Sequence, residues 1–310
     1  MAIRWDALCQ QSVLPSVYAS IAYLNALRTL GGNEVMCYVI SDEEEDVAGL
    51  AVFQRQRGPF LETTIPFFTS FTPLLLKSLP TTAQIHKRAT IFDALLPALS
   101  ADYDRVGLHL QPGFTDMRTI AWHQWTSKPL YTYRQALSDE TTYTKAWSSS
   151  SRRTLKKGRS AYNVQEDEHA VPQVVQLCTA SYERSRGAAA FDLESTVAFI
   201  KSLQHAGLIR LFTATNVASG EVDAGVAFLL DGPKVHYWVA GSKPGPAMTV
   251  LLGTALPIFY SEGFEEFDWV GANTPSIAEF KRRFGAELVP YFRIERTPNR
   301  FLRILEAIRS

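Results

Sequence analysis

The sequence repeats one pattern of apolar residues and glycines at a fixed separation of 176 positions. Residues 48–51 read Ala-Gly-Leu-Ala, and residues 224–227 read Ala-Gly-Val-Ala. In both copies an amphipathic stretch ends at a glycine, the usual stop of a helix, and two apolar runs separated by a polar turn follow. A repeat of this length constrains the whole fold. We therefore expect residues 20–54 and 196–230 to superpose as helix-strand-strand units of a tandem duplication, and the alternative is a chance match of two common α/β stretches.

Chain length and one polar interruption predict where the two copies meet. A chain of 310 residues exceeds the usual size of one domain. The run Ser-Asp-Glu-Thr-Thr at 138–142 breaks the pattern between the copies, so we place the domains at 1–140 and 141–310. In the second domain, three successive strands over 208–240 precede a helix over 247–262. This order favours a mixed α/β sheet with an antiparallel start and a parallel crossover.

Composition and missing motifs exclude several classes of protein. Lys and Arg number 31, as do Asp and Glu, so no net charge attracts duplex DNA. The three cysteines have no CxxC spacing and the six histidines have no ligand spacing, so we expect neither a disulfide framework nor a metal site. The motifs of dinucleotide enzymes, P-loop NTPases, zincins and α/β-hydrolases are absent. The longest apolar run, 65–76, is too short to span a bilayer, and a cytoplasmic protein is expected.

The loop between the third strand of the second domain and the following helix is the first candidate site. A strand-to-helix turn with glycines presents backbone N–H groups and the positive end of the helix dipole to an anion, and a pyrophosphate group suits such a turn. The alternative is an ordinary connection made rigid by proline. The candidate residues for binding a donor molecule are Gly241, Ser242, Gly245 and Ala247.

This loop resembles the pyrophosphate loop of the GNAT acyltransferase superfamily, which reads [Gln/Arg]-x-x-Gly-x-[Gly/Ala]. Here the matching residues are Ser-Lys-Pro-Gly-Pro-Ala over 242–247. Ser242 replaces the usual Gln or Arg, and neither Pro244 nor Pro246 carries an N–H group. The loop therefore offers coenzyme A fewer hydrogen-bond donors than a standard member does, and we expect acetyl-CoA to bind weakly or not at all.

Two later segments resemble the Fem-type branch of that superfamily, whose members contain two GNAT-like domains in tandem. They are Phe-Asp-Trp-Val-Gly-Ala at 267–272 and Phe-Lys-Arg-Arg-Phe-Gly at 280–285. The resemblance implies two acyl-CoA N-acyltransferase-fold domains and transfer of an aminoacyl group from aminoacyl-tRNA to an amine of a peptidoglycan stem peptide. It also implies that Lys281, with Phe280 beside it, is catalytic.

Physical chemistry supports Lys281 separately. Acyl transfer builds negative charge on the attacked carbonyl oxygen, and a fixed cation lowers that barrier. We expect the Lys281 ammonium at the mouth of a cleft, with Phe280 and Phe284 packed on the opposite, buried face of the helix. The alternative is that Lys281, Arg282 and Arg283 form a solvated helix end.

A basic helix over 148–160 is the third candidate, because its cations recur on one face. This face is suited to a phosphate, a tRNA acceptor end or an acidic substrate, and the alternative is a solvated surface. Tyr237 and Asp268 are also candidates, and periodicity does not say which side chains face the cleft. The residues assigned to substrate binding are Arg152, Arg153, Lys156, Arg159, Tyr237 and Asp268.

Together these features predict a GNAT or Fem-type acyltransferase that moves an acyl or aminoacyl group to the amine of a small molecule or peptide. The donor is acyl-CoA or aminoacyl-tRNA, and no metal is expected. Two alternatives stay open: a non-catalytic binding module with the same fold, and a strict acyl-CoA N-acetyltransferase.

Overall fold

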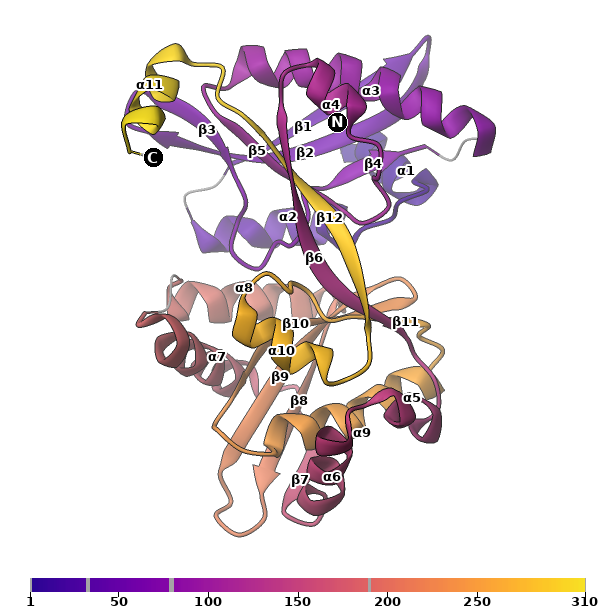
Figure 1. Cartoon of the computed structure of the whole chain (residues 1–310), viewed down its shortest axis with the longest axis vertical. Helices are drawn as coiled ribbons and strands as arrows, with labels where there is room; N and C mark the ends of the chain where they lie inside the picture. Colours follow the sequence, from indigo (N-terminus) through magenta and orange to yellow (C-terminus); the bar gives the residue numbers. More distant parts are fainter. Residues whose placement is uncertain (1, 32–33, 78–80, 189–190, 310) are drawn as a thin grey trace. The chain divides into compact units, whose positions relative to one another are not determined.

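The computed structural model describes residues 2–31, 34–77, 81–188 and 191–309 (Figure 1). The chain divides into two compact units, Met1–Leu130 with Pro290–Ser310, and Tyr131–Val289. Strands β6 (Thr126–Ala136) and β12 (Glu287–Arg296) each contribute residues to both units. The predicted domains, 1–140 and 141–310, differ from these units, because the end of β12 pairs with β5 (Val106–Leu110) and so places the C-terminal residues in the first unit.

The first unit contains a meander of three antiparallel strands, β1, β2 and β3, and β4 pairs with the other edge of β2. A parallel bridge between Glu62 and Arg105 links β3 to the start of β5. Long helix α3 packs the apolar side chains of its segment 91–99 against β2, β4 and β5 to form the core. The elements not yet given bounds are α1 (Ala2–Gln11), η1 (Val17–Ala19), α2 (Ile21–Ala26), η2 (Leu27–Leu30), β1 (Glu34–Asp42), β2 (Glu45–Arg57), β3 (Phe60–Thr64), β4 (Leu74–Leu76), α3 (Thr81–Asp102), α4 (Arg118–Trp122) and α11 (Arg300–Arg309).

The second unit contains a sheet in the order β6-β11-β10-β9-β8-β7. Pairing is antiparallel except between β10 and β11, which helix α9 connects, so the predicted mixed sheet with a parallel crossover is confirmed. Along β9, Ala224, Val226 and Phe228 pack with α9, while Gly225 faces α7, so helices cover both faces of the sheet. The remaining elements are α5 (Glu140–Ala146), α6 (Ser149–Gly158), β7 (Tyr162–Glu166), α7 (Val171–Arg186), α8 (Leu193–His205), β8 (Ile209–Asn216), β9 (Val222–Asp231), β10 (Lys234–Ser242), α9 (Ala247–Ser261), β11 (Glu266–Asp268) and α10 (Pro275–Arg282).

The two predicted repeats have the same kinds of element in the same order. Gly49 lies in β2 and Gly225 in β9, and each allows a helix to approach the sheet closely. A Cβ atom on Gly49 would lie 2.9 Å from the Trp5 side chain of α1, and one on Gly225 would lie 2.8 Å from Val174 of α7. The glycines that end the preceding helices, Gly31 and Gly207, have φ angles of 67° and 71°.

The hairpins of the two copies differ in length, although the copies themselves are separated by a constant 176 positions. Gly49 pairs with Val39, ten positions earlier, whereas Gly225 pairs with Thr213, twelve positions earlier. The second hairpin is therefore two residues longer, and the chain from Gly207 to Thr213 is two residues shorter than the chain from Gly31 to Val39. The elements of the two copies therefore correspond, although their hairpins differ in length.

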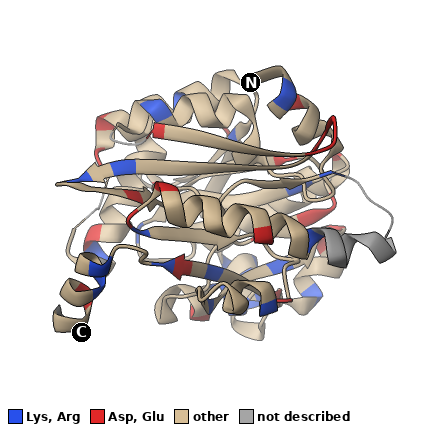
Figure 2. Cartoon of the chain, turned by 90° about the horizontal axis from the view of Figure 1, so that it is seen from above, with Lys and Arg blue, Asp and Glu red and all other residues tan. Residues whose placement is uncertain are grey.

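Charged residues are interspersed on the side of the chain seen in Figure 2. Within the described ranges, no helix is long and apolar enough to cross a membrane. The described part of the chain also holds no cluster of three or more His, Cys, Asp or Glu residues that suits a metal ion.

Candidate functional site

Strands β10 and β11 separate soon after they meet. Their parallel pairing covers only Lys234–His236 against Glu266–Asp268, after which β11 ends and β10 continues to Ser242. The register between β10 and β9 also shifts between Tyr237 and Val239. The pairing of the two strands therefore ends well before β10 does, and α9 begins five residues after the end of β10.

The first turn of α9 lacks a capping side chain. Pro246 occupies the cap position and makes no side-chain hydrogen bond, so the N–H groups of Ala247, Met248 and Thr249 have no capping side chain. Gly245, just before, has a φ angle of 143°, a conformation that side chains rarely adopt. This turn keeps the backbone donors and the dipole that suit an anion.

Gly241 and Ser242 pack the loop against α7 and are not part of its exposed surface. A Cβ atom on Gly241 would lie 2.1 Å from the backbone carbon of Leu177, so only glycine allows α7 to pack there. The carbonyl oxygen of Ser242 accepts a hydrogen bond from Arg184, and its N–H donates to the Ser181 hydroxyl. These two residues therefore shape the predicted donor loop, whereas its exposed residues are Pro244 and Gly245.

Lys281 is buried, contrary to the expectation of an exposed ammonium, because α10 packs it against the loop that follows β11. The residue is 4% exposed. Its Nζ donates to the carbonyl oxygens of Trp269 at 2.5 Å, Gly271 at 2.7 Å and Val270. The reading of the whole Lys-Arg-Arg run as a solvated helix end was also wrong, since only Arg282 and Arg283 are exposed.

The backbone at 270–271 curls around this ammonium. Val270 has a φ angle of 50° and Gly271 one of 73°, and this curl directs three successive carbonyl groups at one cation. Burial lowers the pKa of Lys281 to about 7, against the opposing charge of Asp268. Lys281 is therefore the described lysine best placed to exchange a proton near neutral pH.

Asp268 is a fully buried carboxylate that holds the same loop from its other side. It accepts hydrogen bonds from Thr132 at 2.6 Å, Arg134 at 2.8 Å and the N–H of Val270 at 2.9 Å. Burial acts most strongly and raises the pKa of Asp268, but the charges of His236 and Arg134 and these hydrogen bonds outweigh it and hold the pKa below its ordinary value. Because the Asp268 carboxylate already accepts three hydrogen bonds, it positions the loop and has little capacity left to accept a hydrogen bond from a substrate.

Aromatic rings enclose Lys281. Its Nζ lies 5.5 Å from the centre of the Tyr237 ring, which lies 5.7 Å from the Trp269 ring. Phe284 is buried and stacks on Trp269, and the rings of Phe280 and Phe284 lie 5.1 Å apart. Burial raises the pKa of Tyr237, so its phenol stays protonated at neutral pH and is not a base there.

The basic helix is α6, and its cations divide into two groups. Arg152 donates to the carbonyl oxygens of Lys145 and Trp147, and Arg159 pairs with Glu140, so these two stabilise α5. The other cations are exposed and make no ion pair with any described residue; they are Arg153, Lys156 and Lys157.

Helix α6 also packs against the start of α9. A Cβ atom on Gly158 would lie 2.6 Å from the Val250 side chain and 3.4 Å from Pro246. The exposed cations of α6 therefore belong to the helix that contacts the uncapped turn.

Sequence reasoning missed the contribution of β6. Thr132 and Arg134 reach Asp268 because they are two residues apart on one strand and so point to the same face. This alternation was present in the sequence, but β6 pairs with β11 through residues that are 130 to 134 positions apart.

Solved structures share this fold over nearly the whole chain. FemX superposes with a TM-score of 0.74 at 9% identity, covering 98% of both chains. A tandem GNAT protein from the clavulanic acid biosynthesis pathway has a TM-score of 0.55 at 14% identity and covers 96% of this chain and 94% of its own. The C-terminal domain of a putative lysylphosphatidylglycerol synthetase from Agrobacterium fabrum has a TM-score of 0.58 at 13% identity, with 95% and 91% covered. No family model and no curated protein matches the sequence. The predicted tandem GNAT fold of the Fem type is thus confirmed as a fold.

Proposed function

We propose that this protein is an N-acyltransferase of the GNAT fold that moves an aminoacyl group to an amine. The observation that carries the proposal is the divergence of β10 and β11 beside the uncapped first turn of α9. The turn provides backbone donors for a phosphate of the donor molecule. FemX and the tandem GNAT protein, which share the fold, give the proposal its class of reaction.

The chemistry requires one bond to form and one to break. The acceptor amine attacks the carbonyl carbon of the donor, an oxyanion forms, and the bond to the leaving oxygen or sulfur breaks to give an amide. The amine loses a proton, and the leaving group gains one. We assign Lys281 to stabilisation of the oxyanion, because a cation in a dry environment acts over a longer distance than one in water.

The charges on α6 favour aminoacyl-tRNA over acyl-CoA as the donor. Arg153, Lys156 and Lys157 are exposed on the helix that packs on the start of α9, as a polyanionic donor requires. Pro244 and Pro246 remove two backbone donors from the loop that a CoA pyrophosphate would need. The acceptor is the amine of a peptide or small molecule.

One observation supports a second candidate, a binding module without catalysis. All three N–H groups of Lys281 already have carbonyl acceptors, so the ammonium must give one up before it can donate to an oxyanion. In this case Lys281 only shapes the loop at 269–271.

Thermal unfolding with aminoacyl-tRNA and with acetyl-CoA tests the donor. A bound donor raises the melting temperature by mass action. We expect a rise with aminoacyl-tRNA that Arg153→Glu removes and that Arg118→Glu, an exposed arginine of the first unit, retains. A rise with acetyl-CoA alone would show that the donor assignment is wrong.

A further inference from the structure

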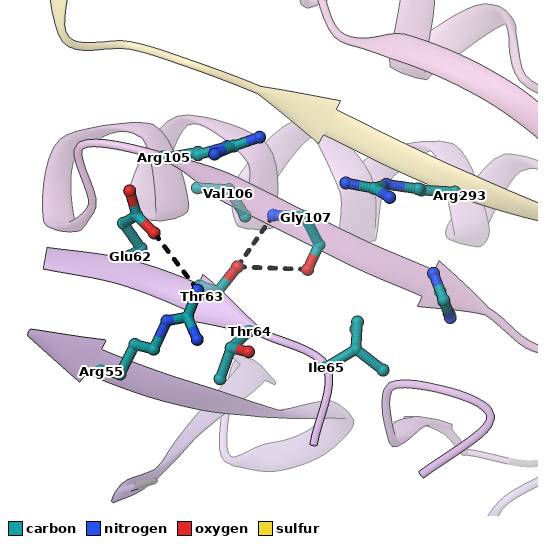
Figure 3. A pocket seen from close by; sticks show the side chains of 10 residues that line it. Arg55, Glu62, Thr63, Thr64, Ile65, Arg105, Val106, Gly107 and Arg293 are labelled. Atoms are coloured by element: carbon teal, nitrogen blue, oxygen red, sulfur yellow. Dashed lines mark hydrogen bonds and ion pairs between the residues drawn. The ribbon is translucent and has the colours of Figure 1, made fainter. Parts of the chain in front are cut away.

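A pocket in the first unit lies along β3 and β5. Its volume is about 250 Å³, and its lining residues come from β2, β3, the loop after β3, β5 with Arg105 just before it, and β12. The Thr63 hydroxyl accepts a hydrogen bond from the N–H of Gly107 at 2.8 Å and holds the two strands together at its base (Figure 3). Strands β3 and β5 follow the hairpin of the first repeat as β10 and β11 follow that of the second, so the pocket occupies the corresponding place in the other copy.

Three arginines give this pocket its chemistry. Arg55, Arg105 and Arg293 all line it, and each pairs with one carboxylate among the residues that the structure describes. The distances between a guanidinium nitrogen and a carboxylate oxygen are 3.9 Å for Arg55 and Glu62, 3.3 Å for Arg105 and Glu306, and 2.8 Å for Arg293 and Glu295. A guanidinium carries five N–H groups, so most of these donors are left for a ligand. His109 also lines the pocket, and burial lowers the pKa of His109, so it adds no charge at neutral pH.

Glu62 is the acidic member of the lining and is almost fully buried. Its side chain is 4% exposed, and among the described residues it makes no hydrogen bond, only the long contact with Arg55. Figure 3 shows Glu62 beside Arg55 and Arg105, with Arg293 toward the other end of the pocket. A buried carboxylate without a hydrogen-bond donor is costly, and an N–H group of a ligand would supply the missing donor.

Gly107 keeps the pocket open. A Cβ atom at this position would lie 3.9 Å from Nη2 of Arg293, and no other heavy atom lies within 4 Å. The guanidinium of Arg293 therefore extends over the bare backbone of β5. A larger side chain at 107 would occupy the space beneath it without removing any charge.

We propose that this pocket binds a small zwitterion: Arg105 and Arg293 hold its carboxylate or phosphate, and Glu62 accepts a hydrogen bond from its amine. The volume is below the ~300–1,000 Å³ of typical pockets for larger ligands, which limits the ligand to about the size of an amino acid. The inference concerns the first unit and does not depend on the transferase chemistry of the second. Planar guanidinium groups bind both carboxylate and phosphate with two parallel hydrogen bonds, so the two kinds of anion share one chemistry here.

Calorimetric titration of the full chain with two probes tests the proposal: L-glutamate for the carboxylate and O-phospho-L-serine for the phosphate. Glutarate, which lacks the amine, is the matched control for glutamate. We expect at least one probe to bind with a Kd of about 1 mM or tighter. Glutarate should bind at least about 10-fold more weakly than glutamate if the carboxylate is the preferred anion.

Variants separate the proposed contacts. Arg105→Gln and Arg293→Gln should each weaken binding at least about 10-fold and leave the melting temperature nearly unchanged, because exposed ion pairs contribute little to stability. Gly107→Val should abolish binding by filling the space. Glu62→Gln should remove the preference for the amine-bearing probe. Arg118→Gln, on an exposed arginine outside the pocket, should bind as the wild type does.

Two results would overturn the proposal. The first is that neither probe binds the wild-type protein. The second is that Arg105→Gln, Arg293→Gln and Gly107→Val all bind a probe as tightly as the wild type. Equal affinity for glutamate and glutarate, with the arginine variants impaired, would remove the amine from the proposal and leave a simple anion site.

Discussion

The ammonium of Lys281 lies 2.7 Å from the carbonyl oxygen of Gly271 and donates to the two preceding carbonyls as well. Asp268 binds the N–H of Val270 in the same loop at 2.9 Å. A buried cation and a buried carboxylate thus hold one short segment at the end of β11. Mutation and titration of Lys281 distinguish a catalytic lysine from a structural one.

Lys281→Met should lower the free energy of unfolding by about 1–3 kcal/mol, because three carbonyl groups lose their common donor. Arg282→Met is the matched control, since Arg282 is the next residue, is exposed and pairs with the exposed Glu279. Urea unfolding of the two variants at pH 7 measures the difference. Equal stability of both variants would contradict the description of Lys281 as the residue that holds the loop.

The pH dependence of stability should report the buried ammonium. The folded pKa of Lys281 is about 7, below its ordinary value of 10.5, so between these values the unfolded chain binds more protons than the folded one. The stability of the wild type relative to Lys281→Met should therefore rise from pH 7 to pH 10, by at least about 1 kcal/mol. A flat difference over this range would mean that the three carbonyl acceptors keep the pKa near its ordinary value.

The donor loop should bind acetyl-CoA poorly. Pro244 and Pro246 have no N–H groups to donate to its pyrophosphate, so we expect a Kd well above 1 μM, the value that corresponds to about −8 kcal/mol. Pro244→Ala adds one donor at an exposed position and should improve binding. Calorimetry that finds tight binding by the wild type would refute this reading of the loop.

The two arginines at the start of α6 should behave differently. Arg153→Glu should leave stability unchanged and weaken binding of tRNA, more so at low salt. Arg152→Gln should cost about 1 kcal/mol of stability, since Arg152 donates to two carbonyls of the α5 end. Filter binding at two salt concentrations measures the tRNA affinity, and thermal unfolding measures the stability. Unchanged tRNA affinity in Arg153→Glu would show that the exposed face of α6 is an ordinary solvated surface.

The glycines of β10 and β5 should differ in their tolerance of a methyl group. Gly241→Ala places a Cβ atom 2.1 Å from the backbone of α7 and should destabilise the chain by about 3 kcal/mol or more. Gly107→Ala meets one side-chain atom at 3.9 Å and should cost less than about 1 kcal/mol. Chemical unfolding of the two variants compares them directly, and similar costs would show that α7 moves away from β10 easily.

Periodicity and glycine spacing were sufficient to predict the order of elements in the second unit and the correspondence of Gly49 with Gly225. The elements follow from local patterns that repeat every two to four residues, and the correspondence follows from one constant offset of 176 positions. The return of 290–310 to the first unit could not be predicted in this way, because it depends on β12 pairing with β5 across more than 170 positions.

For the candidate site, too, local sequence patterns predicted some features, and long-range contacts determined the others. The motif at 280–285 identified Lys281, but its burial depends on the curled backbone at Val270 and Gly271, and no local pattern indicates which carbonyls converge. The pocket at Arg105 and Arg293 was missed, since its arginines lie far apart in sequence and meet only through strand register.

The most direct test of the proposed transferase is a single-turnover assay with aminoacyl-tRNA as donor and amine-bearing peptides as acceptors, in which mass spectrometry detects the new amide. Wild type, Lys281→Met and Arg282→Met are compared at a temperature at which all three are folded. We expect amide formation by the wild type, a rate at least about 10²-fold lower for Lys281→Met, and an unchanged rate for Arg282→Met. Undiminished turnover in Lys281→Met would remove Lys281 from the mechanism, and no amide from the wild type with either aminoacyl-tRNA or acyl-CoA would contradict the transferase itself.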